Sequence, residues 1–521
     1  RSIFTGIADV YFYSKLNLLN NNPMKYLYIK IAVVLSAVVS LSSCDSFLDE
    51  TPDNRLRLNS YETIAELVTN AYPEGSGVFM EWMSDNVGAD PKNIQRSEMT
   101  QAYNWQDVEQ EGQDTPSFYW SGNYKAIAHA NQALEALEEV KENNPGYKDA
   151  IRGEALACRA FAHFMLVSTF AKSYDPATAA SDKGIVIMTK PEENLLATYE
   201  RSSVQEVYDF VEKDLLEAIE LVSDQYYKNS GKYHFNRAAL MAFASRFFLF
   251  KKDYEKVEKY ATELLGTDYN PQMIRDYTQV YTGTTSEMMG RKFTAATLPS
   301  NLLLIRKDVL YGYKGYAGYR FNQDVYNGLV LSQRDLRFSV SYSYGGTSSF
   351  LPKFQRDLIR KTSLTSSSGY PYVIEVAFRG EEVFFNRLEA WAMMGTTKLS
   401  QFESQFSRYL KAVYAGTVDY PILYQNYQRF YPGVPANELR LKMVLDEKRR
   451  EFVEEGLRWF DICRHKLSVT HTDIAGVTRI LQPDDSRKVI QIPESAIIYG
   501  DLQPNERKNI SEPEAHLVIR N

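Results

Sequence analysis

The chain has 521 residues, of which 66 are acidic and 59 are Lys or Arg, and its formal net charge is −7. This balance argues against a nucleic-acid-binding protein, because phosphate binding needs a basic face. The length is enough for a large buried core, and it favours two to three domains or one extended repeat architecture. The 37 tyrosines outnumber the 27 phenylalanines. Tyrosine suits both helix packing and surfaces that stack on sugars or peptides.

A secretory signal leads up to Cys44. Lys25 and Lys30 form a short basic stretch, residues 31–41 are apolar, and Leu-Ser-Ser-Cys closes the run. The run is about half of the ~20 residues that span a bilayer as a helix, so a signal peptide is favoured over a membrane span. Its end resembles a bacterial lipobox, which predicts Cys44 as the lipidated first residue of the mature protein. The alternative is an ordinary signal peptide with a chance cysteine nearby.

We therefore expect residues 1–43 to be removed. Residues 1–23, upstream of Met24, are interpreted as an extension that takes no part in the fold. Residues 44–521 are expected to form the mature protein. No second apolar stretch approaches spanning length, so the lipid is the only anchor that the sequence predicts.

Long helical patterns follow in pairs. Apolar residues recur at helical spacing over residues 120–141 and again over 149–171, which predicts an antiparallel helical hairpin. Ser203 and Glu206 have the spacing of a capping box at the start of the next helix. Asn236 is placed to cap a further helix.

The helix after Asn236 and its partner look like one tetratricopeptide unit, with small residues on the first helix and Tyr254 and Ala261 on the second. In such a unit each helical pair buries one face only by stacking on its neighbours. Further helical pairs are suggested by residues 380–394 with 399–416 and by residues 438–466. No strict period of about 34 residues is visible. The predicted fold class is mainly α, a degenerate tetratricopeptide-type scaffold of helical pairs.

Two irregular regions interrupt the helices, at about residues 79–119 and 269–376. The first is acidic and carries several aromatic residues, and the second is rich in Gly, Ser, Thr and Tyr. Loops of this length inside a domain tend to be functional. The acidic bias of the first loop suits a cationic peptide, a calcium ion or plain solvation.

No catalytic constellation is recognisable. The six histidines have no metal-binding spacing, and neither a GxSxG nucleophile elbow nor a P-loop is present. The separation of paired carboxylates for glycoside hydrolysis is a three-dimensional quantity that the sequence does not reveal. The sequence therefore predicts no catalytic residue, no metal and no cofactor.

Short motifs along the chain match those of one family. Cys44–Pro52 resembles the lipidated start C-x-x-F-L-D-x-x-P, and Trp120–Asn131 fits W-x-x-x-Y-x-x-I-x-x-A-N. The most specific match is at residues 444–461, which resembles E-R-R-x-E-F-x-x-E-G-x-R-W-x-D with Lys448 in place of the first Arg. On these motifs the chain resembles the SusD/RagB family of surface lipoproteins from Bacteroidetes. Two other family motifs, N-x-x-R-x-R and a C-terminal N-P-x-x-x-Q-N run, are missing.

The best-matching segment also has a physical interpretation. Its charged residues lie three or four apart, which predicts an ion-pair lattice along one helix face; they are Glu447, Arg450, Glu451 and Glu454. Phe452, Trp459 and Phe460 are expected to form a buried stripe. These motif residues are interpreted as scaffold.

The resemblance implies a single SusD-like domain over residues 44–521, held on the outer face of the outer membrane. It implies that the protein captures a nutrient, an oligosaccharide or polysaccharide, and closes as a lid over a SusC-like TonB-dependent barrel. Uptake energy then comes through the barrel, so no nucleotide is needed. The same lid role for peptides is one alternative, and a surface glycan-processing enzyme is another.

Ligand residues in this family come from variable loops, so none is transferred by motif. Candidates chosen by residue type and position are Trp105, Tyr103, Tyr311, Tyr313, Tyr316 and Tyr319. Trp105 is the main candidate because its polar neighbours in sequence offer no helix to bury it. Packing of Trp105 on the first helix pair is the alternative.

Overall fold

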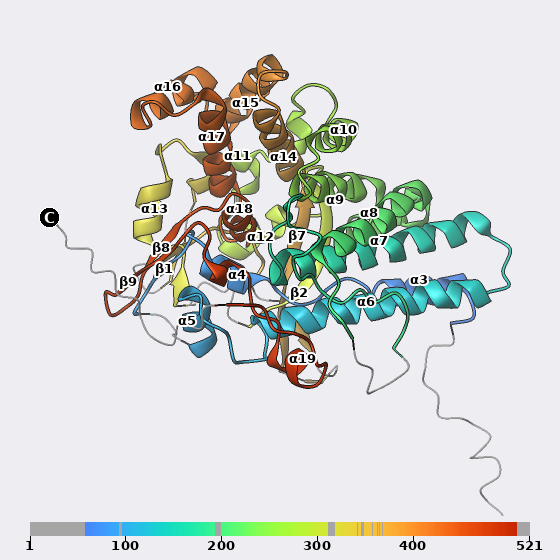
Figure 1. The fold of residues 1–521 in the computed structure, drawn as a ribbon. Helices are drawn as coiled ribbons and strands as arrows, with labels where there is room; N and C mark the ends of the chain where they lie inside the picture. Colours follow the sequence, from blue (N-terminus) through green and yellow to red (C-terminus); the bar gives the residue numbers. More distant parts are fainter. Residues whose placement is uncertain are drawn as a thin grey trace, which may run out of the picture. The chain divides into compact units, whose positions relative to one another are not determined.

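The computed structural model describes residues 58–507, apart from 93–95, 193–198, 311–317, 341, 345–347, 357, 362, 364 and 367. The chain from Leu58 onward groups as one unit. Within this unit, helices lie side by side in pairs next to a small sheet (Figure 1). The prediction of a mainly α fold built from helical pairs is confirmed.

The first long helices pack side by side, and two of them form a hairpin. They are α3 (Tyr61–Val68), α6 (Pro116–Glu139), α7 (Pro145–Phe170) and α8 (Val204–Leu221). The predicted hairpin of residues 120–141 and 149–171 corresponds to α6 and α7, but both helices begin earlier than predicted. Thr115 caps α6 and Asn144 caps α7 through side-chain oxygens, and proline occupies the first helical position of each, where its missing N–H costs nothing.

The next helices complete the pairs. They are α9 (Arg237–Phe250), α10 (Tyr254–Leu265), α14 (Gly380–Met393), α15 (Leu399–Val413), α16 (Tyr420–Phe430) and α17 (Ala436–Glu451). The capping box predicted for α8 is confirmed, because Ser203 Oγ accepts from the Glu206 N–H at 3.2 Å and Glu206 Oε2 accepts from the Ser203 N–H at 2.7 Å. Asn236 Oδ1 accepts from the Ala239 N–H at 2.9 Å and so caps α9 as predicted.

Residues 438–466 form two helices, in line with the suggested pair, so the motif segment is not one continuous helix. The chain leaves the helix after Glu451 and resumes as α18 (Arg458–Arg464). Between them Glu454 has φ +68° and Gly456 has φ +73°, a left-handed conformation that no helix continues through. The Glu81 carboxylate holds this turn, since it accepts from the N–H groups of Glu454 and Gly456 at 2.7 and 2.9 Å.

The region 269–376 is not irregular throughout, which corrects the prediction. It contains β2 (Asn301–Asp308), β6 (Ile359–Lys361) and most of β7 (Gly369–Arg379), which pair antiparallel in the order β2-β7-β6. Its shorter elements are α11 (Tyr277–Val280), α12 (Ser286–Phe293), α13 (Gln323–Leu329), β3 (Tyr319–Arg320), β4 (Tyr342–Tyr344) and β5 (Ser348–Phe350). The first loop, 79–119, likewise contains α4 (Val78–Met83), β1 (Gly88–Ala89) and α5 (Ser97–Tyr103).

Two small elements lie near the end of the described chain. One is the ribbon of β8 (Val469–Thr472) and β9 (Thr478–Leu481), and the other is the short helix α19 (Glu494–Ile498). β1 pairs with β3, with Gly88 opposite Arg320 and Ala89 opposite Tyr319. This pairing joins the two long loops of the sequence.

Buried ion pairs tie α17 to its neighbours. Arg450 pairs with Glu447 at 2.9 Å along the helix, as predicted. Glu451 instead reaches across to Arg379 of β7 at 2.6 Å, and Glu454 accepts from the Leu351 N–H at 3.0 Å. The predicted lattice on one helix face is therefore wrong in part, because the carboxylates mostly bind groups of other elements. The predicted stripe of Phe452, Trp459 and Phe460 is buried, at 1, 1 and 4% exposure.

Candidate functional site

A groove of about 1010 Å³ runs along α16 and α17. Its other wall comes from the end of α13 and the residues after it. The lining residues include Asp85, Leu329, Leu331, Asn426, Tyr427, Phe430, Tyr431, Glu438, Lys442, Asp446, Arg449 and Arg458. A hollow of this size lies at the upper end of the range for small-molecule sites, so it has room for several sugar units.

Aromatic rings form one side of the groove. Tyr427 and Tyr431 have ring centroids 5.9 Å apart, and Lys442 Nζ lies 4.7 Å over the Tyr431 ring. Phe430 is 79% exposed, and Tyr431 is 39% exposed. Exposed rings beside polar groups are the arrangement that stacks on the apolar face of a sugar ring. The Tyr427 hydroxyl donates to Asp446 at 2.8 Å, which fixes its ring in place.

A cluster of charges closes one end of the groove. Asp85 accepts from Arg458 Nε and Nη2 at 2.9 and 3.0 Å, and Arg449 Nη1 lies 3.2 Å from its carboxylate. Burial would raise the pKa of Asp85, but these two guanidinium groups hold it well below the usual range. The Asp85 carboxylate is therefore charged, and its oxygens are already bound by Arg449 and Arg458. The neighbouring groups Asn426 and Glu438 are exposed and free to meet a ligand.

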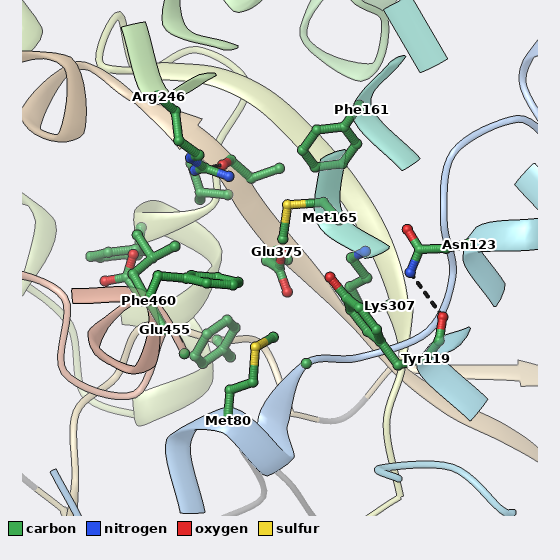
Figure 2. A pocket seen from close by; sticks show the side chains of 17 residues that line it. Met80, Tyr119, Asn123, Phe161, Met165, Arg246, Lys307, Glu375, Glu455 and Phe460 are labelled. Atoms are coloured by element: carbon green, nitrogen blue, oxygen red, sulfur yellow. Dashed lines mark hydrogen bonds between the residues drawn. The ribbon is translucent and has the colours of Figure 1, made fainter. Parts of the chain in front are cut away.

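A much smaller cavity lies inside the protein, between α6, α7, α9 and strands β2 and β7. Its volume is about 50 Å³, and Figure 2 shows Lys307, Glu375 and Arg246 around it together with Met80 and Met165. Burial lowers the pKa of Lys307 and raises the pKa of Glu375, while each charge opposes the shift of the other. A space this small suits water that hydrates buried charges and does not admit a sugar ring.

The structure buries Trp105, Tyr103 and Tyr319, so the expectation that Trp105 is exposed is wrong. Their exposures are 1, 2 and 2%. Trp105 Nε1 donates to the Met83 carbonyl at 2.8 Å. The reason for the burial is distant in sequence, because His471 of β8 stacks on Trp105 at 4.5 Å.

The three residues and His471 form one continuous stack of rings. Tyr319 stacks on Tyr103 at 4.3 Å, and Tyr103 stacks on His471 at 4.0 Å with an angle of 4° between the rings. His471 is in turn stacked on Trp105. The predicted residues Trp105, Tyr103 and Tyr319 are thus brought together, as packed rings. Tyr311, Tyr313 and Tyr316 lie outside the described residues, as does Cys44.

The groove residues were not singled out from the sequence. A signal for them exists, because residues 420–431 carry five aromatic residues among exposed polar ones. Ring positions at the end of α16 then face outward, since Phe430 ends the helix and the chain turns at Pro432 and Gly433. Aromatic residues at a helix end next to a Pro-Gly turn are therefore a usable sign of an exposed platform.

None of the helices in the described part of the chain is long and apolar enough to cross a bilayer. In the same part of the chain, no three or more His, Cys, Asp or Glu residues are grouped to hold a metal ion.

The fold and the groove define a helical-pair scaffold with a large open groove and with loops inserted between the helices. Residues 46–249 match a family described as "Starch-binding associating with outer membrane". A SusD-like protein of Formosa agariphila is 30% identical over 156 residues, which is 30% of this chain and 27% of that protein. The match thus spans about a quarter of that relative's length.

Solved structures share the fold over most of its length. A SusD superfamily protein from Bacteroides vulgatus aligns with a TM-score of 0.65 and 19% identity, covering 88% of this chain and 99% of that one. A second, from Bacteroides thetaiotaomicron, gives a TM-score of 0.63 and 18% identity over 86% and 100% of the two chains. A SusD-like carbohydrate binding protein from Bacteroides vulgatus gives 0.61 and 17% over 88% and 99%. The family match over residues 46–249 agrees with the SusD/RagB resemblance that the motifs predict, and the solved structures show the same fold over most of the chain.

Proposed function

We propose that this protein is a surface-exposed outer-membrane lipoprotein that captures an oligosaccharide or polysaccharide. It delivers the glycan, as a lid, to a SusC-like TonB-dependent transporter, and it has no catalytic activity of its own. The observation that carries this proposal is the groove of about 1010 Å³ with the exposed rings of Phe430 and Tyr431 at its rim. The description of the matching family as starch-binding and outer-membrane-associated supports the same ligand and location.

The groove has the chemistry that a glycan needs. Phe430 and Tyr431 offer apolar ring faces for stacking, while Asn426, Glu438 and Lys442 offer donors and acceptors for hydroxyl groups. Asp85 is already bound by two arginines, so we assign it to shaping the end of the groove. A binding protein for uptake needs moderate affinity, and a half-open groove of this kind releases its ligand readily.

The stack of Trp105, His471, Tyr103 and Tyr319 has a supporting role in this proposal. Tyr319 lies in β3, directly after the stretch that carries Tyr311, Tyr313 and Tyr316. We propose that the stack holds the base of that tyrosine loop and that the three loop tyrosines contact the ligand. Residues that act in this way position a site without touching the nutrient.

Attachment and domain organisation complete the proposal. A lipid on Cys44 tethers a single SusD-like domain, residues 44–521, beside its transporter while leaving it free to swing. A lid needs both properties, because the ligand must enter before closure and pass to the barrel after it.

Calorimetry against a panel of glycans and peptides tests the proposal, using the protein and two variants. We expect a glycan to bind and Phe430→Ala to weaken binding about threefold to tenfold, the value of one aromatic stacking contact. Tyr233→Ala is the matched control, because Tyr233 is also exposed, at 45%, and does not line the groove. Binding of peptides alone would replace the glycan as ligand, and shortening of the glycan chains during incubation would contradict the non-catalytic role.

A further inference from the structure

A second surface hollow has a chemistry that glycan capture does not use. It has a volume of about 260 Å³ and lies between the loop after Trp105, the first residues of α6 and the chain around α19. Figure 1 shows α19 beside the N-terminal end of α6. The loop belongs to the acidic region 79–119, whose composition suits a cationic peptide, a calcium ion or plain solvation.

The floor of this hollow is apolar. Ile490 and Ile492 are 4 and 2% exposed, and Val108 and Ile497 are half-buried beside them. The apolar surface continues outward over α19, where Ile498 is 61% exposed. Apolar surface left open next to a defined hollow favours a contact with another molecule.

The rim is acidic and mostly unpaired. Glu109, Glu111 and Glu494 are exposed, and within the described chain none of their carboxylates makes a hydrogen bond or an ion pair. Asp107 pairs with Arg507. Four carboxylates therefore surround the floor with one guanidinium among them. This excess of negative charge favours the binding of a cationic partner.

Arg507 adds a directed donor to the hollow. Its side chain is 5% exposed, and Nη2 donates to the Trp105 carbonyl at 3.1 Å. Its Nε–H is buried and has no acceptor among the described residues. The carbonyl of a bound peptide chain would supply the missing acceptor.

We propose that this hollow is a docking site for a Lys- or Arg-bearing segment of a partner protein. One apolar side chain of the segment sits on the floor, its cationic side chains meet Glu109, Glu111 and Glu494, and a backbone carbonyl accepts from Arg507 Nε. The volume of about 260 Å³ is below the ~300–1,000 Å³ of drug-sized sites, so it fits one anchoring side chain and not a whole small-molecule ligand. An apolar anchor within a charged rim is how small interfaces gain both affinity and specificity.

The test uses the full protein and a fluorescein-labelled peptide Lys-Leu-Arg-Leu-Lys, with binding followed by fluorescence anisotropy at low and high salt. We expect the peptide to bind, and binding to weaken as salt screens the rim. The peptide Lys-Ser-Arg-Ser-Lys, which keeps the charge and lacks the anchor, should bind at least about fivefold more weakly. Equal binding of the two peptides would overturn the proposal, because it would mean charge attraction without a pocket.

A triple variant Glu109→Gln, Glu111→Gln, Glu494→Gln separates this rim from general surface charge. We expect it to lose at least about fivefold in affinity for Lys-Leu-Arg-Leu-Lys. The matched control replaces three exposed glutamates of other helices, Glu139→Gln, Glu220→Gln and Glu255→Gln, and should bind as the unchanged protein does. Equal losses in the two triple variants, or none in the first, would overturn the proposal. Glycan binding in the groove serves as the folding control, and its result is independent of the peptide.

Discussion

His163 is a single buried side chain with a strong effect on pH-dependent stability. It is fully buried in α7, its Nδ1 lies 2.8 Å from the Arg159 carbonyl, and its Nε2 accepts from the Met188 N–H at 3.1 Å. These two bonds suit a neutral ring. Burial lowers the pKa of His163 to about 3. Below pH ~6.5 the His163 ring therefore binds a proton in the unfolded chain but not in the folded protein.

The stability that His163 contributes is therefore complete above pH ~6.5 and is lost as the pH falls toward 3. From pH 7 to 5 we expect a loss of about 2 kcal/mol in the free energy of unfolding. In His163→Gln this part of the pH dependence disappears, because Gln keeps an acceptor for Met188 and does not titrate. Urea unfolding at pH 7 and 5 measures the difference between the two proteins, and the same difference at both pH values would contradict the prediction.

Trp105 shows what the sequence does not reveal about a single residue. Its neighbours in the chain are polar, which favours exposure, yet the ring is buried. The groups that bury it are the Met83 carbonyl and the ring of His471, and His471 is 366 residues away in sequence. Local composition reports only local neighbours, so contacts made through the tertiary fold decide the exposure of such residues.

The turn between α17 and α18 is an element whose form rests on one glycine. Gly456 has φ +73°, and a Cβ added there would touch only the Gly77 carbonyl oxygen, at 3.5 Å. The space is sufficient, so the cost of Gly456→Ala comes from the left-handed backbone alone, about 1–2 kcal/mol. We expect a lower midpoint in thermal unfolding. Gly112→Ala is the control, since its Cβ would meet nothing within 4 Å and its φ is ordinary, and equal stability of both variants would contradict the role of the turn.

Helices were predictable from the sequence to a larger extent than strands. The caps at Ser203 and Asn236 are local signals, and both hold in the structure. β2 and β7 lie at opposite ends of a Gly- and Ser-rich region, and their pairing of Ile305 with Glu375 spans 70 residues. A strand formed by so distant a partner has no strong local pattern of its own, so the region looked irregular.

At the scale of the whole molecule, the motif segment and the groove are two faces of the same helix. Toward the interior, Glu447 and Glu451 of α17 bind Arg337 and Arg379 in fully buried pairs. Toward the surface, Lys442, Asp446 and Arg449 of α17 line the groove. The family resemblance identified the interior face, because packing restricts those residues. It did not identify the groove, since the motif residues Arg449 and Arg458 that line it bind Asp85, and the exposed rings of α16 belong to no family motif.

The proposed tether concerns the whole protein, and Cys44 is the residue on which we expect it to depend. In cells grown with labelled palmitate, the unchanged protein should take up the label and sediment with membranes, since two or more acyl chains anchor a protein stably. Cys44→Ala should lose the label and leave the membrane fraction. Cys463→Ala is the matched control, because this free cysteine is partly buried in α18 and removing it should alter neither property. Purified Cys44→Ala should bind its glycan with unchanged affinity, because the groove is built from α13, α16, α17 and their neighbours. Label retained in Cys44→Ala would contradict the lipid anchor and, with it, the lid that swings on a tether.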